Sequence, residues 1–328
     1  MTAVRVTLGV ILLALCGWVL SYVFAPAGEE AAPTTFTSSA QCKDCHQEVW
    51  SEWESSAHAN SWINPDVRAL SNDFANTDCI DCHAPRPIFE TGIGKRVLPR
   101  SARRAEGVDC ISCHMLPDGR IAGTVDDPQA ACRPLARVEL TREEFCAACH
   151  DQHQTVQQWK SSRYAEQGIG CLDCHMPYRS ADPKSGRDHR CLGGHDIELV
   201  RSAVELRGVR EGDGWMIELE NVGAGHSFPT DERSRAADLF WRPRPAEGAT
   251  PEPWKHFYRF RSPYRYEVGI EDNLLLVHET RRIPLEAAGA QGAVQVALFY
   301  KLTPYYEDPE QPDPEREARL VHQVELAP

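Results

Sequence analysis

The sequence predicts an α+β protein in which a region of short helices and loops precedes a β-sandwich-like region. Five Cys-x-x-Cys-His motifs lie within residues 42–175, where apolar periodicity is scarce and Gly, Pro and polar loops are common. Beyond His195, short stretches of alternating apolar and polar residues follow, as is typical of strands. We therefore divide the chain into an N-terminal segment (1–27), a linker (28–40), a motif region (41–195) and a β region (196–328).

The N-terminal segment contains a mostly apolar run at 6–25 that is long enough to cross a bilayer as a helix. Arg5 precedes this run and Glu29 follows it, which favours a cytoplasmic N-terminus and an exported body. The sequence at 25–27, Ala-Pro-Ala, resembles a signal-peptidase site, so cleavage after Ala27 would release a periplasmic form. We expect an uncleaved transmembrane anchor, with the body on the periplasmic side of a bacterial inner membrane.

The five motifs predict covalent attachment of haem, because two thiols can add across the vinyl groups of a porphyrin while the next histidine ligates the iron. A thioredoxin-like dithiol or a zinc ribbon needs no histidine directly after the second cysteine. The motif cysteines are Cys42 and Cys45, Cys79 and Cys82, Cys110 and Cys113, Cys146 and Cys149, and Cys171 and Cys174. The motif histidines are His46, His83, His114, His150 and His175. We therefore expect five haem c groups, which would form the core of a region too poor in aliphatic residues to build one otherwise.

Three cysteines remain outside the motifs. Cys16 lies in the apolar N-terminal segment, which leaves Cys132 and Cys191 as the one spare pair in the body of the chain. In an exported protein this pair could form a disulfide. Two buried free thiols, or packing of Cys191 against a haem, are the alternatives that the sequence leaves open.

Five of the other eight histidines are candidates for the second axial position of an iron. His58 ends an expected helix that begins at the first motif, and His153 lies one helical turn after the fourth motif histidine, from where it could serve a neighbouring haem. His189 and His195 bracket a glycine-containing segment, and His226 lies in a Gly-rich turn, where small residues permit close approach of a flat cofactor. We interpret the remaining three as structural or exposed: His256, His278 and His322.

The β region contains six stretches with strand-like alternation, separated by Gly, Pro and charged turns. In one of them Val294, Val296, Leu298 and Tyr300 would share one face. Together the stretches favour a sandwich over a barrel. They are residues 197–209, 214–223, 236–243, 281–287, 293–302 and 318–326.

The formal net charge is −13, which disfavours binding to nucleic acid. An acidic surface suits docking to a basic redox partner protein, although it can equally serve solubility.

The motifs resemble those of the multihaem c-type cytochrome family that includes the tetrahaem cytochrome of ammonia oxidisers and the hydroxylamine oxidoreductase-like proteins. The likeness rests on the repeated Trp-x-Ser-Ser sequence at 53–56 and 159–162, and on CLDCHMP, HRCLGGH and GAGHSFPT, and it covers residues 41 to about 230. It implies that His58, His189, His195 and His226 are distal haem ligands. Two departures stand out: Tyr164 replaces the histidine of the second repeat, and Cys191 lies where the family has an aromatic residue.

Two functions follow from these assignments. An electron relay needs every iron closed by two histidines, and five candidates for five haems favour it. An oxidoreductase acting on a small nitrogen or sulfur compound needs one open haem, which Tyr164 could mark as a proton donor or pocket lid. We expect the relay, with redox partner proteins as donor and acceptor.

Overall fold

The computed structural model describes residues 35–327, except 152–153, 231–232, 265 and 287–291. The predicted N-terminal anchor and His153 lie outside the described residues. Within the described part, no helix is both long and apolar enough to span a membrane. The division of the body at residue 195 stays a prediction.

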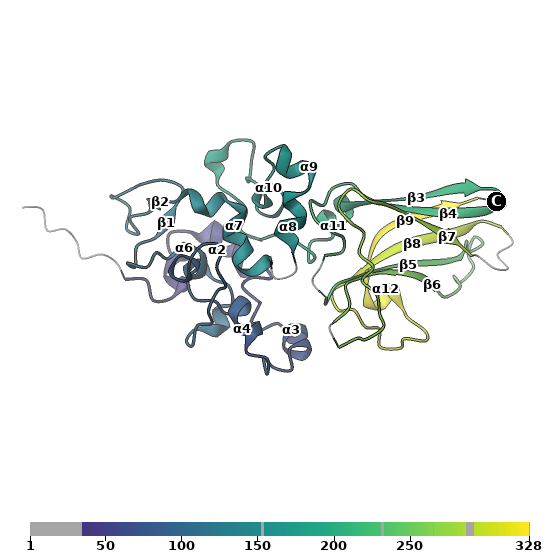
Figure 1. Ribbon diagram of the computed structural model, residues 1–328, viewed down its shortest axis with the longest axis horizontal. Helices are drawn as coiled ribbons and strands as arrows, with labels where there is room; N and C mark the ends of the chain where they lie inside the picture. Colours follow the sequence, from purple (N-terminus) through teal and green to yellow (C-terminus); the bar gives the residue numbers. More distant parts are fainter. Residues whose placement is uncertain (1–34, 152–153, 231–232, 265, 287–291, 328) are drawn as a thin grey trace, which may run out of the picture. The chain divides into compact units, whose positions relative to one another are not determined.

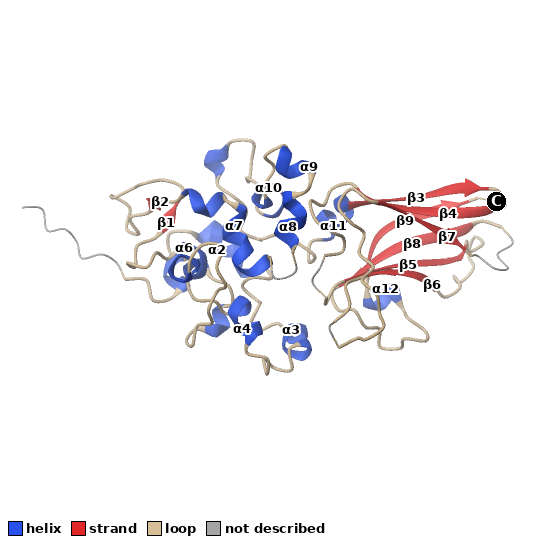
Figure 2. Cartoon of the chain, in the orientation of Figure 1, coloured by secondary structure: helices blue, strands red, loops and turns tan. Residues whose placement is uncertain are grey.

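The motif region consists of short helices separated by long loops (Figure 2). Its α-helices are α2 (Gln47–Glu54), α3 (Pro65–Leu70), α4 (Asp78–His83), α5 (Ile88–Thr91), α6 (Cys110–His114), α7 (Glu143–His150), α8 (Thr155–Lys160), α9 (Arg163–Glu166) and α10 (Cys171–His175). The 3-10 helices are η1 (Ser39–Cys42), η2 (Arg104–Glu106), η3 (Val138–Thr141) and η4 (Pro183–Ser185). Two short parallel strands also pair here, β1 (Ala122–Gly123) and β2 (Leu135–Ala136).

The β region forms two antiparallel sheets that share one apolar core (Figure 1). The first sheet has the order β3-β4-β7, with β3 (Val204–Glu211), β4 (Gly214–Asn221) and β7 (Thr280–Leu285). The second has the order β6-β5-β8-β9, with β5 (Ala236–Pro243), β6 (Lys255–Phe260), β8 (Val294–Lys301) and β9 (Arg319–Leu326). The short helix α12 (Pro314–Glu317) precedes β9. The predicted sandwich is therefore confirmed as a pair of facing sheets.

Strand β8 shows why the sandwich is stable. Val294, Val296 and Leu298 lie in the core between the sheets, as the alternation predicts. The opposite face of β8 is also buried, because Ala297 and Phe299 pack into a second apolar cluster with Phe240, Trp254 and Tyr306.

Two predictions about the β region need correction. Residues 197–203 form helix α11 (Ile197–Ala203), and the strand begins only at Val204. The helix begins there because the Asp196 side chain accepts a hydrogen bond from the Leu199 N–H, and Val200 packs into the sandwich core. The sequence also missed β6, whose Lys, His and Arg side chains hide its alternation because it is an edge strand that pairs only with β5.

The motif region is held together by polar contacts as well as by small apolar clusters. Arg100, which follows the second motif, is almost fully buried and donates to Asp109, to the Ser112 hydroxyl and to the Pro85 carbonyl. Asp109 also caps α6 by accepting from the Ser112 N–H at 2.9 Å. This arginine therefore fixes the helix of the third motif against the segment of the second.

Candidate haem centres

Four of the five motifs form short helices that end at the motif histidine: α4, α6, α7 and α10. In a helical turn, two cysteines three residues apart lie on the same face, so both thiols can reach one edge of a porphyrin. The first motif differs, since Cys42 ends η1 and His46 precedes α2. The local structure thus presents the attachment groups as the haem reaction requires.

Three of the five motif histidines are oriented by backbone carbonyls. Nδ1 of His83 lies 2.9 Å from the Ser61 carbonyl oxygen, that of His114 2.8 Å from the Ala122 oxygen, and that of His175 2.6 Å from the Leu192 oxygen. Because a carbonyl oxygen can only accept, Nδ1 carries the proton in each ring. Nε2 is then the nitrogen available to bind a metal, which is the arrangement typical of metal-ligating histidines.

Three motif histidines each face a second histidine from a distant part of the chain. The pairs, with their distances between ring centroids, are His58 and His150 at 6.0 Å, His114 and His189 at 6.4 Å, and His175 and His226 at 6.2 Å. A metal–imidazole bond is about 2 Å long and a ring centroid lies about 1 Å beyond its nitrogen, so two imidazoles across one metal have centroids about 6 Å apart. The three pairs therefore fit one haem iron each.

Two properties of the second histidines in these pairs favour binding to iron: the orientation of the ring and its neutral charge. Nδ1 of His189 lies 2.8 Å from the Arg187 carbonyl oxygen, and that of His226 lies 2.9 Å from the Ser227 oxygen, so both again present Nε2. Burial lowers the pKa of His58 to about 4 and that of His226 to about 4. Both rings are consequently neutral at pH 7, the state in which imidazole binds iron.

Thiols from different motifs lie beside one another, which places the attachment sites in a defined order. The neighbouring sulfurs are those of Cys42 and Cys110, of Cys82 and Cys149, and of Cys146 and Cys171. Cys113 joins Cys82 and Cys149 around one apolar cluster that contains Val97 and Phe145. The fourth motif thus adjoins the second, the third and the fifth, and the third adjoins the first.

Two buried donors in the motif region have no hydrogen-bond partner among the described residues. They are the indole Nε1 of Trp50, on α2, and the Nε of Arg137, between β2 and η3. A buried N–H without an acceptor is costly, and haem propionates are carboxylates that could supply one. These donors therefore also fit a region that holds haem.

Comparison with known proteins gives two family matches, both within the motif region. Residues 41–115 match the family described as "Cytochrome c554 and c-prime", and residues 133–188 match "NapC/NirT cytochrome c family, N-terminal region". The chain is a multihaem c-type cytochrome. Its haem c groups are covalently bound.

The cytochrome shares its fold with a solved structure. The crystal structure of a penta-heme cytochrome c552 from Thermochromatium tepidum has a TM-score of 0.65 and 19% sequence identity, with 89% of this chain and 99% of that chain covered.

Two curated relatives are much longer than the matched part. "Cytochrome c-552" of Aliarcobacter butzleri (strain RM4018) is 24% identical over 54% of this chain and 42% of its own length. The "Probable nitrite reductase-hydroxylamine oxidoreductase fusion protein" of Kuenenia stuttgartiensis is 27% identical over 46% of this chain and 17% of its own length. The cytochrome thus spans less than half of either relative.

The other predicted ligands of the cytochrome are placed differently. His195 is exposed, and its backbone carbonyl accepts from Arg319 at 2.7 Å. Within the described part of the chain, neither His46 nor His83 faces a second histidine at the spacing of the three pairs. His153, the remaining candidate, lies outside the described residues. These assignments stay predictions.

The two departures from the family pattern have structural roles in the cytochrome. The Tyr164 hydroxyl donates to the Val222 carbonyl at 2.6 Å, so it ties α9 to the turn after β4 and its proton is already engaged. The Cys191 thiol lies 3.4 Å from the His189 carbonyl oxygen. Cys132 and Cys191 are both partly buried, and their pairing stays a prediction.

Gly107 keeps His58 in place, and an alanine there should displace it. Its φ is +60°, and a Cβ would lie 2.4 Å from the carbonyl oxygens of both His58 and Ala59. We expect Gly107→Ala to push this segment away from His150 and to convert one haem from low spin to high spin, as measured by EPR of the oxidised protein. The left-handed backbone alone costs an alanine about 1–2 kcal/mol.

Gly119→Ala is the matched control for this variant. Gly119 also has a left-handed φ, +84°, but its Cβ would meet nothing within 4 Å. It should therefore lose stability without changing the spin state. If both variants gave the same EPR spectrum, contact with Gly107 would not position His58.

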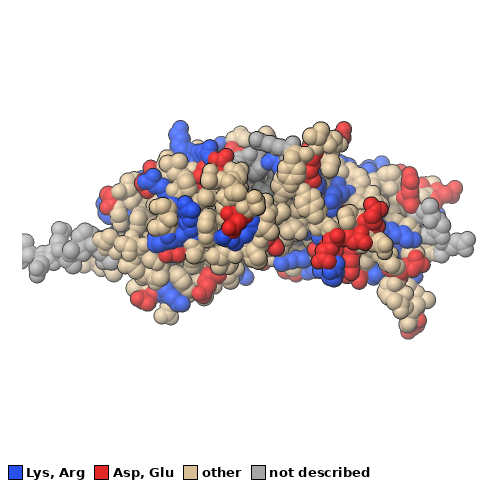
Figure 3. Space-filling view, turned by 90° about the horizontal axis from the view of Figure 1, so that it is seen from below, with Lys and Arg blue, Asp and Glu red and all other residues tan. Residues whose placement is uncertain are grey.

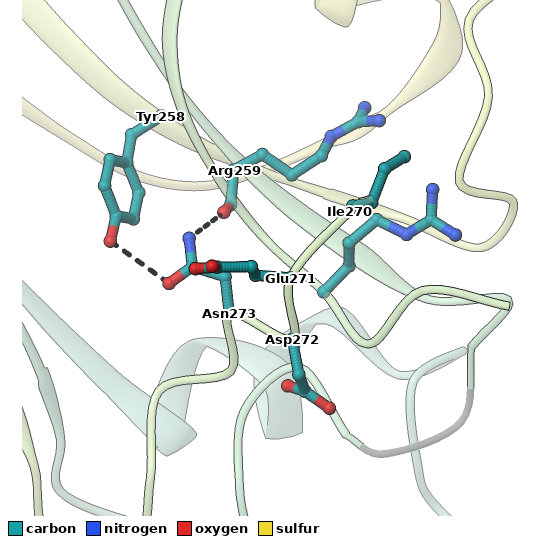
Figure 4. Close-up of a pocket in the computed structure, with 7 residues that line it drawn as sticks. Tyr258, Arg259, Ile270, Glu271, Asp272 and Asn273 are labelled. Carbon is teal, nitrogen blue, oxygen red and sulfur yellow. Dashed lines mark hydrogen bonds between the residues drawn. The ribbon is translucent and has the colours of Figure 1, made fainter. Parts of the chain in front are cut away.

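A separate pocket of about 460 Å³ lies in the β region (Figure 4). Asn273 crosses it, accepting from the Tyr258 hydroxyl at 3.2 Å and donating to the Arg259 carbonyl at 2.6 Å. Arg259 and Arg261 are paired with Asp238 and Glu267. The pocket contains no motif residue, so we do not assign it to the redox chemistry.

Proposed function

We propose that this protein relays electrons between redox partner proteins through five haem c groups, each with two histidine ligands. The observation that supports this most strongly is the set of three facing histidine pairs. When bound, haem supplies one-electron redox chemistry, and two histidines leave its iron without a position for substrate. Cysteines and histidines of this chain then provide attachment, ligation and shielding.

The order of attachment sites supports a branched relay. The first motif adjoins the third through Cys42 and Cys110, and the third adjoins the fourth near Cys113. The fourth motif adjoins both the second and the fifth, so it forms the branch point. Each step in this order joins neighbouring motifs, as fast transfer of electrons requires.

Two of the three ends of this branched order, the first and the fifth motifs, are accessible. Cys45 of the first motif and Cys174 of the fifth are exposed, whereas the other motif cysteines are partly buried. We therefore assign the first and fifth haems as the points of exchange with partner proteins. On the face seen in Figure 3, acidic and basic side chains are interspersed, so docking there would rely on local charge pairs.

The second ligands of the first and second haems are also part of the proposal. His195 is the candidate partner for His83. Burial lowers the pKa of His195, and the Asp66 carboxylate on α3 opposes this shift. Phe74 packs against the His83 ring and stacks on Trp62. His153 is the remaining candidate, for the first haem.

The attachment of haem c implies that the protein is exported from the cytoplasm. Cytochromes of the matched families are typically periplasmic or exported. We propose that the body lies on the periplasmic side of a bacterial inner membrane, anchored through residues 6–25. A form cleaved after Ala27 would be released into the periplasm.

An enzyme is the second candidate. The match to a nitrite reductase-hydroxylamine oxidoreductase fusion protein leaves room for it without favouring it. The observation in its favour is that His46 and His83 face no second histidine at 6.0–6.4 Å within the described residues. An open haem at either position could act on a small nitrogen or sulfur compound. The Tyr164 hydroxyl already donates its proton to the Val222 carbonyl. This argues against Tyr164 as the proton donor or lid of an open haem pocket.

EPR of the oxidised, haem-loaded protein, followed by carbon monoxide binding after reduction, separates the two functions. For the relay we expect only low-spin signals and no carbon monoxide adduct, with five haems per chain by pyridine haemochrome assay. A stoichiometric high-spin haem that binds carbon monoxide would contradict the relay. The His83→Ala and His46→Ala variants would then show which haem is open.

A further inference from the structure

An ion pair between two segments of the motif region lies directly behind His189. Glu52 is on α2, after the first motif, and Arg179 follows the fifth. Arg179 Nε donates to Glu52 Oε1 at 2.6 Å, and its terminal nitrogen Nη2 donates to Oε2 at 2.7 Å. Both side chains are about five-sixths buried, at 17% and 16% exposure. A bidentate pair of this kind is geometrically specific.

The same carboxylate holds the backbone of His189. Glu52 Oε2 accepts the His189 N–H at 2.9 Å and lies 4.0 Å from its ring Nδ1. Nδ1 itself donates to the Arg187 carbonyl, so the carboxylate acts on the ring through its charge and on the backbone through a hydrogen bond. The ring faces His114 at the spacing of an iron pair.

Arg179 is in turn fixed by the loop that carries His189. Its Nη1 donates to the Ser185 carbonyl at 2.8 Å, and its backbone N–H donates to the Gly186 carbonyl at 3.0 Å. A Cβ at Gly186 would lie 2.8 Å from Nη1, so this arginine fills the space against the loop. The pair therefore links three parts of the motif region. They are the helix that follows the first motif, the loop that follows the fifth motif, and His189, the candidate second ligand of the third haem.

We propose that Glu52 and Arg179 are positioning residues for the third haem, which orient His189 and set the redox potential of that haem through two opposite charges. The proposal rests on the proposed function, in which His114 and His189 ligate one iron. Groups beyond the first ligand shell are known to tune both ligand orientation and metal potential. No feature of the sequence alone pointed to either residue.

Two charge-removing variants should shift this potential in opposite directions. Glu52→Gln keeps the shape and leaves the Arg179 charge, which stabilises the less positive reduced state, so the midpoint potential of the third haem should rise. Arg179→Gln leaves the Glu52 carboxylate, so the potential should fall. The double variant should lie between them. The measurement is a spectroelectrochemical titration of the haem-loaded protein.

Controls separate this effect from general damage. Glu48 lies 3.8 Å from Arg179 but its side chain is 74% exposed, so Glu48→Gln should leave the potential nearly unchanged. Arg179→Lys keeps the charge and loses the planar fork, so its potential should stay closer to wild type than that of Arg179→Gln. If Arg179→Gln does not fold, Arg179→Lys still tests whether the planar guanidinium affects the potential.

The outcomes distinguish the two proposals. His189→Ala should make the third haem high spin by EPR; unchanged low-spin content would overturn the ligation on which the inference rests. If His189→Ala behaves as expected but Glu52→Gln and Arg179→Gln shift the potential in the same direction, or not at all, the positioning role is wrong while the relay stands.

Discussion

His226→Ala is expected to convert one haem in five from low spin to high spin and to lower the thermal stability of the β region. The His226 ring faces His175 at 6.2 Å between centroids, with an angle of 15° between ring planes. His226 follows β4, whereas His175 ends α10, so a shared iron would connect the β region to the motif region. EPR and a melting curve followed by far-UV circular dichroism measure the two effects.

The turn that holds His226 is fixed independently of any iron. The Asn221 side chain donates to the His226 carbonyl at 2.9 Å, and the Ser227 N–H donates to the Gln158 side chain, on α8, at 2.9 Å. The substitution should therefore remove the ligand without unfolding its surroundings.

His278→Ala is the matched control for His226→Ala. His278 is exposed and accepts from the Arg163 N–H at 3.1 Å, so it also joins the β region to the motif region, but it faces no motif histidine among the described residues. It should leave the spin states unchanged. If low-spin content survived in His226→Ala, the connection through an iron would be refuted.

Asp238→Asn should cost about 3–5 kcal/mol of unfolding free energy, because it breaks a buried ion pair and leaves an unpaired charge. The Asp238 carboxylate, on β5, is fully buried. It accepts from Arg259 at 2.6 and 2.9 Å and from the Tyr306 hydroxyl at 3.0 Å, and it lies 3.4 Å from His256 Nε2. Urea unfolding followed by tryptophan fluorescence measures the change.

Glu307→Gln provides the comparison, since its ion pair with Arg316 is exposed on both sides and should contribute far less. A cost for Asp238→Asn no larger than that of Glu307→Gln would contradict the role of the buried pair.

Asp238 should also make the stability of the β region sensitive to acid. Burial alone would raise the pKa of Asp238, but hydrogen bonds from His256 and Arg259 outweigh it and hold the pKa below its ordinary value. Its stabilising effect is therefore complete above the unfolded-state pKa of about 4 and is lost as the pH falls through the folded-state value. Asp238→Asn should be less stable at neutral pH but should lose less stability on acidification.

Where sequence and structure differ, the difference follows from what surrounds each segment. Strands β4, β5 and β8 were predictable because alternation along a strand reports directly which side chains face a core. Residues 197–203 alternate too, yet they form α11, because Asp196 caps a helix there and Val200 meets the sandwich core from the helix. Strand β6 was missed because an edge position tolerates the polar residues that obscure a pattern.

The sequence by itself determined that this protein carries covalently bound haem, because attachment depends on two thiols and a histidine within one helical turn. It also named His58, His189 and His226 as candidate ligands. Only the tertiary structure decided which motif histidine each of them faces, since the members of each pair come from separate segments. The roles of Gly107, Glu52 and Arg179 likewise depend on contacts between segments far apart in the chain, which local spacing cannot encode.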